Sequence, residues 1–130
     1  MSALSNYAED KILEHMLNGV VWAAPATVYV SLYTSEPGDD DSGSEVSGFG
    51  YARVAMTGGW TNVSGTSTNT ALVTFPTASG GSWGILTHFG VHDASSGGNL
   101  LVYGALDTPT NIADTNIAEF AAGALSVSMA

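Results

Sequence analysis

The sequence predicts a mainly β fold, an antiparallel β-sandwich or jelly-roll-like domain with one N-terminal amphipathic α-helix. Short runs rich in β-branched and aromatic residues recur along the chain, each bounded by glycine, serine, proline or asparagine. A helical period, in contrast, occurs near the N-terminus. With 130 residues the chain has the length of one domain. We therefore predict a single domain over residues 1–130, with a helix at about 3–18 and a β domain at about 26–130.

The helix is predicted by apolar residues that follow one another at intervals of three and four. These residues share one helical face, and most charged residues of the segment lie on the other face. Asn18-Gly19 ends the pattern, and both residue types tolerate the left-handed conformation that closes a helix. The apolar positions are Leu4, Tyr7, Ala8, Ile12, Leu13, Met16 and Leu17.

The strand at 27–34 is the most regular of the predicted strands. Val28, Val30 and Leu32 share one of its faces, and we expect that face to meet the core. Residues 93–99 are rich in Asp, Asn, Ser and Gly, which favour turns, so the strands on either side of them should form a long-tipped hairpin. The other predicted strands are 51–56, 71–75, 85–92, 100–106 and 125–129.

The charge of the chain excludes several classes of partner. Twelve acidic residues against Lys11 and Arg53 give a formal net charge of −10. Such a chain repels nucleic acid and anionic lipid headgroups. It also contains no apolar run near the roughly 20 residues of a membrane span. We therefore expect no nucleic acid and no membrane among its partners.

Two further features bear on the compartment. The chain has no cysteine, which excludes disulfides and thiolate metal sites. Its first residues lack the basic start and the apolar block of a secretory signal. Synthesis in a cytoplasm is the expectation that follows.

The acidic loop 38–47 has the composition of a calcium loop. An EF-hand that began at Asp39, however, would need an acid where Gly50 stands. We interpret the loop as a solvated, mobile connection, with calcium binding as the alternative.

No group of residues predicts catalysis or a metal site. His88 and His92 share a strand face but lie roughly 13 Å apart, too far to bind one metal ion. The chain has no G-x-S-x-G motif around a serine nucleophile and no carboxylate pair placed for glycoside cleavage. We expect no catalytic residue, no metal, no cofactor and no enzymatic activity.

Phe49 lies between two glycines in a stretch that superficially resembles a phosphate-binding loop. A dinucleotide-binding loop needs a third glycine and a following helix, whereas an alternating pattern follows here. We interpret Gly48-Phe49-Gly50 as a bend before a strand that begins at Tyr51.

Arg53 and Trp22 complete, with Phe49, the candidates for structural or assembly contacts. Arg53 is expected on the less apolar face of its strand, where it can pair with an acid such as Glu45 or meet an acidic patch on a partner. Trp22 lies at a junction between predicted elements and is expected to pack structurally.

Five phrases of the sequence occur in an order that characterises one protein family. They are MSALSNYAEDKILEHML, TVYVSLYTSEP, EVSGFGYARVAM, THFGVHDASSGGNLLVYGAL and FAAGALSVSM. Together, over nearly the whole chain, they resemble small virion proteins of tailed bacteriophages, labelled tail-fibre proteins and in some viruses similar to capsid decoration or cement proteins. One departure is Phe49, which interrupts the triple glycine that this family has before Tyr-Ala-Arg. The bend should therefore be gentler, or Phe49 should pack outward.

The resemblance implies a structural protein of the virion. We expect a capsid decoration (cement) protein that binds the outside of the major capsid protein shell and stabilises it, as a homo-oligomer such as a trimer. The alternative is a short tail-fibre or tail-tip component that contacts the host surface through loops such as 38–47 and 93–99. A virion glycan hydrolase is a remote alternative. The expected location is the capsid exterior of the virion, after synthesis in the bacterial host cytoplasm.

Overall fold

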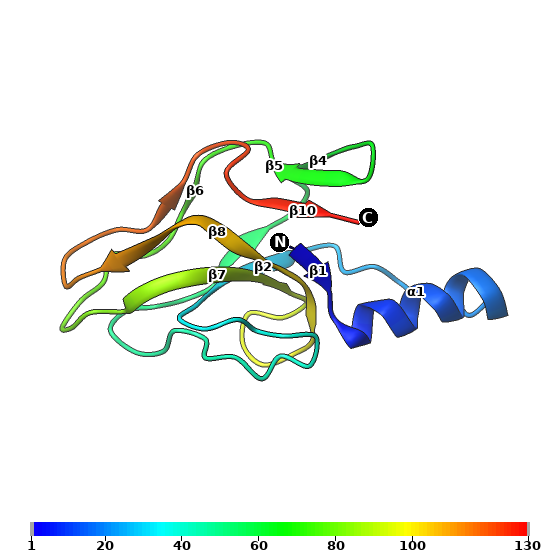
Figure 1. Cartoon of the computed structure of the whole chain (residues 1–130), viewed down its shortest axis with the longest axis horizontal. Coiled ribbons are helices and arrows are strands. Elements are labelled where there is room, and N and C mark those ends of the chain that lie inside the picture. The colour runs from blue at the N-terminus through cyan, green and yellow to red at the C-terminus, as the bar shows by residue number, and fades with distance from the viewer. Residues whose placement is uncertain (1, 130) are drawn as a thin grey trace.

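The structure is a computed structural model that describes residues 2–129. Residues 1 and 130, the two ends of the predicted domain, lie outside the described part. Antiparallel strands dominate the fold and one helix lies near the N-terminus (Figure 1), which confirms the predicted fold class. The elements are β1 (Ser2–Leu4), α1 (Asn6–Asn18), β2 (Val28–Tyr33), β3 (Val54–Met56), β4 (Trp60–Val63), β5 (Thr66–Asn69), β6 (Val73–Thr74), β7 (Gly84–His92), β8 (Leu100–Ile112), β9 (Glu119–Phe120) and β10 (Ser126–Ser128).

Helix α1 begins later than the predicted start at about residue 3. Ser5 is its N-cap, and the Ser5 Oγ accepts a hydrogen bond from the amide of Ala8 at 3.2 Å. The residues before Ser5 pair with β8 as strand β1. The predicted end is confirmed, since the helix stops at Asn18 and Gly19 has a φ of +67°.

The larger sheet has five strands in the order β1-β8-β7-β2-β3, all antiparallel. Strands β7 and β8 form the predicted hairpin with its tip at 93–99. Strand β8 runs on to Ile112, beyond the predicted end at residue 106, because its second half pairs with the start of β7. The five strands place the hairpin tip and the β2–β3 connection on one side of the sheet (Figure 1).

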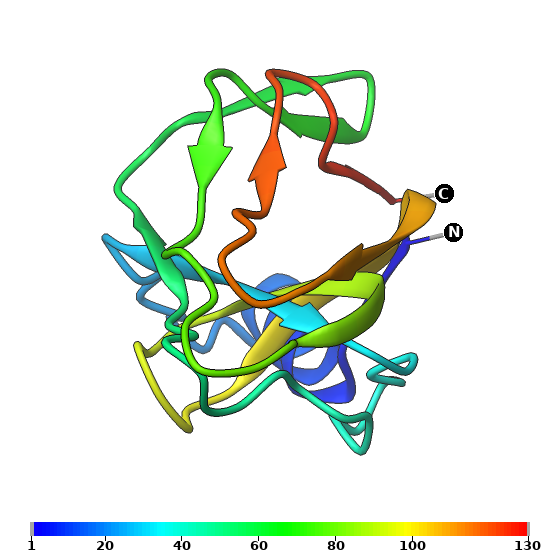
Figure 2. The same cartoon turned by 90° about the vertical axis from the view of Figure 1, so that its left-hand side faces the viewer.

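Two smaller sheets, β10-β5-β4 and β6-β9, lie across from the larger one (Figure 2). The pair β4 and β5 was missed by the sequence analysis because its residues are mostly polar and exposed. Ser64 and Gly65 connect the two strands with φ angles of +50° and +80°. Two central residues with positive φ are the signature of a tight hairpin turn, which explains how so polar a segment forms strands.

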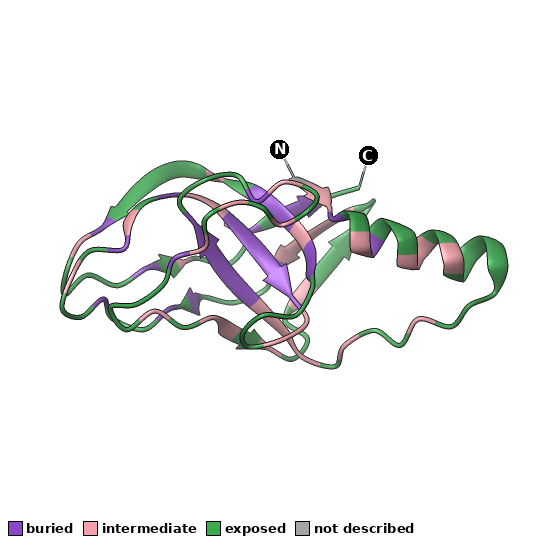
Figure 3. Ribbon diagram, turned by 90° about the horizontal axis from the view of Figure 1, so that it is seen from below, coloured by how far each residue is buried: buried purple, intermediate pink, exposed green. Residues whose placement is uncertain are grey.

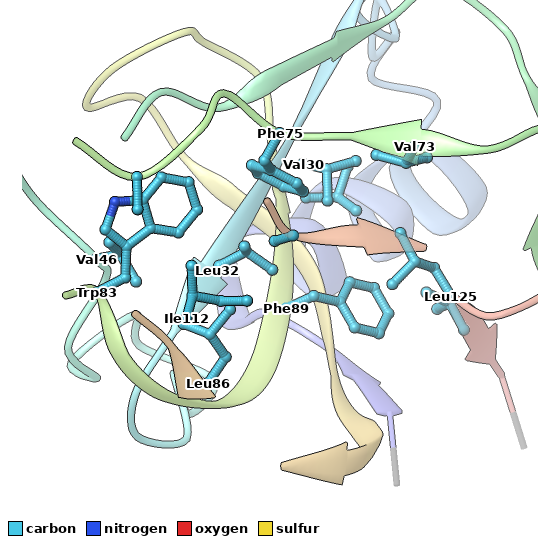
Figure 4. Close-up of a cluster of buried hydrophobic side chains, with 14 residues drawn as sticks. Val30, Leu32, Val46, Val73, Phe75, Trp83, Leu86, Phe89, Ile112 and Leu125 are labelled. Atoms are coloured by element: carbon cyan, nitrogen blue, oxygen red, sulfur yellow. The ribbon is translucent and has the colours of Figure 1, made fainter. Parts of the chain in front are cut away.

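The core lies between the larger sheet and the smaller ones, and Figure 4 shows its side chains pointing toward one another. Val30 and Leu32 are fully buried there, and Val28 packs at the edge, so the predicted core face of this strand is confirmed. Burial of these apolar side chains is the main force that holds the sheets together. The cluster contains Val30, Leu32, Val46, Val73, Phe75, Ala78, Trp83, Leu86, Phe89, Val91, Ile112, Ala118, Leu125 and Val127.

Helix α1 extends away from the sheets (Figure 3). It carries the predicted apolar residues, but Ala8 in its first turns is the one that is buried, whereas Leu13, Met16 and Leu17 are exposed. The apolar face of the helix is thus left largely uncovered by the rest of the chain. No helix among the described residues has the length and hydropathy required to cross a membrane.

Candidate functional site: the loop face

Two loops lie together on one side of the larger sheet, and Arg53 joins them (Figure 1). The first loop, residues 34–53, connects β2 to β3. The second, residues 93–99, is the tip of the β7–β8 hairpin. We call these two segments the loop face.

The Arg53 guanidinium makes four hydrogen bonds. Its Nε and Nη2 donate to the two carboxylate oxygens of Glu45 at 2.8 and 2.7 Å. Its Nη1 donates to the carbonyl oxygens of Ala94 and Gly97 at 2.8 and 2.9 Å. Only 6% of the Arg53 side chain is exposed. A bidentate ion pair to one loop and two backbone contacts to the other therefore fix the two loops relative to each other.

Glu45 is ionised at neutral pH because of its partners. Burial opposes ionisation, but hydrogen bonds from Arg53 and from the Tyr51 hydroxyl, the latter at 2.7 Å, hold the pKa of Glu45 below its usual range. The same contact with Glu45 raises the pKa of Arg53. Burial and the hydrogen bond to Glu45 raise the pKa of Tyr51, so its hydroxyl stays a donor.

Phe49 lies in a tight turn, so the expectation of a gentler bend is wrong, whereas the alternative expectation that Phe49 packs outward agrees with its 49% exposure. Gly48, Phe49 and Gly50 have φ angles of +76°, +52° and +80°, three left-handed residues in a row. The Phe49 ring is half-exposed and rests on Gly81, where a Cβ would lie 2.6 Å from it. The Phe49 carbonyl accepts a hydrogen bond from Trp83 Nε1 at 3.0 Å. These contacts offset the roughly 1–2 kcal/mol that a left-handed conformation costs a residue with a side chain.

The turn also explains why β3 starts later than predicted. The amide of Tyr51 donates to the carbonyl of Gly48 at 3.0 Å, so the chain is still turning at Tyr51. Ladder pairing with β2 begins at Val54, opposite Val30. The predicted strand at 51–56 is shortened to its second half.

Trp22 lies elsewhere and is not part of the loop face. It follows α1 and packs edge to face against Tyr7 of the helix, with ring centroids 6.4 Å apart. The three candidate residues from the sequence are therefore divided: Arg53 and Phe49 belong to the loop between β2 and β3, and Trp22 supports the base of the helix.

A buried polar cluster, missed by the sequence analysis, lies beneath the loop face. His92 Nδ1 is 3.0 Å from Ser31 Oγ, and His92 Nε2 is 3.2 Å both from the Tyr33 hydroxyl and from Asp41 Oδ2. Tyr33 also donates to Asp41 Oδ1 at 2.5 Å, and its ring stacks on the imidazole. We call Ser31, Tyr33, Asp41 and His92 the His92 cluster.

Gly90 makes room for this cluster. A Cβ at Gly90 would lie 2.8 Å from Ser31 Oγ and 3.1 Å from the Tyr33 ring. Only a residue without a side chain leaves that space for Ser31 and Tyr33 on the neighbouring strand. A sequence signal was present, since Ser31 and Tyr33 alternate with Val30 and Leu32 and so had to face the other side of the sheet.

The pKa of His92 is lowered despite its contact with Asp41. Burial, together with the nearby positive charge of Arg53, lowers the pKa of His92, and these effects outweigh the opposing contact with Asp41. Burial and the hydrogen bond to Asp41 raise the pKa of Tyr33 well above its usual range. The Tyr33 hydroxyl therefore stays protonated and donates to the carboxylate.

The acidic loop is solvated as predicted, since Asp39, Asp40 and Ser42 are exposed, but hydrogen bonds also attach it to the sheet. Asp39 accepts a hydrogen bond from the Tyr103 hydroxyl at 2.6 Å, which raises the pKa of Tyr103 to about 12. Asp41 belongs to the His92 cluster. Asp40 is the exposed member, and it contacts the amide of Ser42 at 3.3 Å. Among the described residues, no three His, Asp or Glu side chains are grouped so that they could hold a metal ion.

The hydrogen-bonded series of Ser31, His92 and Asp41 has the same residue types as the catalytic triad of a serine hydrolase. In such a triad the serine must reach the carbonyl of a substrate. Ser31 and His92 are fully buried, at 0% exposed, beneath the loop face. The linkage is therefore an internal hydrogen-bond network that attaches the acidic loop to the sheet.

We expect stability to fall as the pH drops below the ordinary histidine pKa of 6.5. The pKa of His92 is lower in the folded state than in the unfolded chain. As the pH falls, the unfolded chain therefore takes up the proton first and is stabilised relative to the folded state. The contribution is complete above about pH 6.5 and is lost as the pH falls through the lowered value, with a slope of at most about 1.4 kcal/mol per pH unit.

Urea unfolding between about pH 5 and 8 measures this slope. His92→Gln should flatten the profile in that window, and His15→Gln, which removes an exposed histidine, is the matched control. An unchanged profile in His92→Gln would show that the slope comes from other groups.

Comparison with known proteins gives a family for this chain. None of the curated proteins compared with the chain is similar to it. Residues 3–128 match the family model described as "Podophage GP4 fiber I protein gp80". The match spans both loops of the loop face, the His92 cluster and all of α1. The chain therefore belongs to the Gp80 family of bacteriophage fibre proteins and is a structural protein of a phage virion.

Proposed function

We propose that this protein is a fibre component that contacts the host surface through its loop face. The observation that carries the proposal is the set of four hydrogen bonds made by the Arg53 guanidinium, which we call the Arg53 clamp. The clamp holds residues 34–53 and 93–99 together beside a shallow pocket of about 340 Å³. Loops that are ordered before binding lose less conformational entropy when a ligand arrives. Binding residues commonly lie on loops held by a rigid β scaffold.

A hydroxyl-rich, uncharged glycan is the ligand class that fits this pocket. Its lining includes the serines Ser47, Ser95 and Ser96, which supply hydroxyl groups. Glu45 and the net charge of −10 disfavour acidic sugars. We therefore assign host surface polysaccharide of low charge as the contact.

We expect virions that carry Ser96→Trp to adsorb to host cells at least about tenfold more slowly than wild-type virions. The indole fills the pocket, and residue 96 itself makes none of the four hydrogen bonds of Arg53. Adsorption rates of purified virions measure the effect, and Thr108→Trp, at an exposed position of β8, is the matched control. Equal adsorption of all three particles, at equal copy number, would contradict host contact through this face.

The second candidate is decoration of the capsid exterior, where copies would bind the major capsid protein and stabilise the shell. A specific observation favours it: the described residues form no stalk that would hold the β domain away from the particle. Multivalent attachment of such a small subunit lets modest single contacts add up.

Copy number separates the two candidates. Quantitative densitometry of purified virions should give a few dozen copies or fewer for a fibre component and hundreds of copies for a decoration protein. Antibody labelling of intact particles then locates the protein at the tail or on the shell. A count in the hundreds with labelling over the shell would replace the fibre proposal by the decoration proposal.

A further inference from the structure

The free end of α1 presents an uncovered apolar surface. Leu13, Met16 and Leu17 lie three and four residues apart and share one side of the helix. Val20 and Val21 follow directly after the helix ends. All five are exposed, with Leu17 at 75% and Val21 at 83%. We call these five residues the helix stripe.

A concave apolar surface lies close to the start of α1, and Leu4 of β1 is part of its lining. It is a pocket of about 460 Å³ between the larger sheet and the sheet β10-β5-β4. Its lining includes Leu4, Val28, Trp60, Leu101 and Val127, and none of its lining residues is charged. We call it the apolar pocket.

Charge limits the places where two copies of this chain can touch. The chain carries a net charge of −10, and both of its basic side chains are already paired internally, Lys11 with Glu14 and Arg53 with Glu45. Two copies therefore repel each other over most of their surfaces. The helix stripe and the apolar pocket contain no charged residue, so contact between them places no charge in the interface and removes apolar surface from water.

We propose that the helix stripe of one copy inserts into the apolar pocket of a second copy. The two surfaces are different patches of the same molecule, one convex and one concave, so the contact is head to tail, and a closed ring of such contacts would leave no stripe or pocket uncovered. Insertion into the pocket of its own chain is prevented by the direction of α1, which points away from the sheets (Figures 1 and 3). This inference goes beyond the proposed function and holds for a fibre and for a decoration protein alike.

Size-exclusion chromatography with light scattering tests the proposal on the full chain. The wild type should form one discrete oligomer that dissociates on dilution. Leu17→Glu on the stripe and Asn62→Glu at the exposed rim of the pocket should each weaken self-association by about a hundredfold or more, because each places a charge in an apolar contact. Ser67→Glu, deeper in the same pocket, is a second pocket variant.

Mixing the variants gives the decisive result. An Asn62→Glu copy still has an intact stripe, and a Leu17→Glu copy still has an intact pocket. The mixture should therefore form a dimer and nothing larger, although each variant alone is a monomer. Thr108→Glu adds the same charge at an exposed position of β8 and should leave the wild-type oligomer unchanged.

Three outcomes would overturn the proposal. A wild type that is monomeric at all concentrations would show that the two surfaces do not bind each other. If Leu17→Glu loses self-association but both pocket variants keep it, the helices of two copies pack against each other instead. A mixture that stays monomeric while both variants melt like the wild type would exclude the head-to-tail pairing.

Discussion

Arg53→Met is expected to lower the free energy of unfolding by about 3 kcal/mol, since removing one partner of a buried ion pair leaves the other charge uncompensated. The substitution keeps most of the apolar stem of the side chain but removes all four hydrogen bonds of the guanidinium. Glu45 is then left partly buried without its cation, and two carbonyl groups of the hairpin tip lose their donor. Equilibrium unfolding in urea measures the change.

Lys11→Met is the matched control for Arg53→Met. It removes the same charge, but the Lys11–Glu14 pair is exposed and monodentate at 3.4 Å, so we expect a loss of at most about 0.5 kcal/mol. Equal losses in the two variants would show that net charge, and not the clamp, accounts for the effect of Arg53. The double variant with Glu45→Gln should regain part of the stability lost in Arg53→Met, because it removes the uncompensated charge.

Asp41→Ala should destabilise the protein by about 2–3 kcal/mol. The carboxylate accepts from the Tyr33 hydroxyl and contacts His92, and both of these residues are fully buried. Asp41 also has a φ of +57°, a conformation that aspartate tolerates better than alanine. Asp41→Asn keeps an acceptor and the left-handed preference, so we expect it to lie between the wild type and Asp41→Ala.

Asp40→Ala tests whether the effect is specific to the anchored carboxylate. Asp40 has the same charge and lies next in the chain, but its side chain is exposed and contacts a single loop amide. We expect a change within about 0.5 kcal/mol. If Asp40→Ala and Asp41→Ala melt alike in a thermal scan, the His92 cluster does not anchor the acidic loop.

The parts of the fold that could be predicted are those set by local pattern. Strand β2 was expected at 27–34 and is found at Val28–Tyr33, because alternation alone defines its two faces. The end of α1 follows from the glycine that adopts the left-handed conformation there. The β7–β8 hairpin follows from turn residues between two apolar runs.

The parts that could not be predicted depend on partners distant in the chain. Residues 2–4 are a strand because β8 offers them an edge, although their pattern continues into the helix. The far half of β8 is a strand because Gly84 at the start of β7 lies opposite Ile112. Polar strands such as β4 and β5 carry too little apolar alternation to be recognised without their turn.

In the loop face, too, some contacts could be predicted from the sequence and others could not. The ion pair between Arg53 and Glu45 could be anticipated, because these opposite charges are eight residues apart on either side of a glycine turn. The contact of Asp41 with His92 could not, because it joins residues 51 positions apart and depends on the pairing of β2 with β7. Residue types alone identified the acidic loop as solvated, but its attachment to the sheet depends on the buried partners Tyr33 and His92.

The Arg53 clamp also bears on how this protein resists trypsin-like proteases. Trypsin-like enzymes cut after lysine or arginine, and this chain has one of each. The bond after Arg53 lies where the side chain is 6% exposed and held by four hydrogen bonds, and the bond after Lys11 lies within α1. Cleavage at either position requires local unfolding before the chain can enter a protease active site. The scarcity of basic residues that gives the chain its acidic charge therefore also leaves the folded protein with almost no accessible trypsin cleavage site.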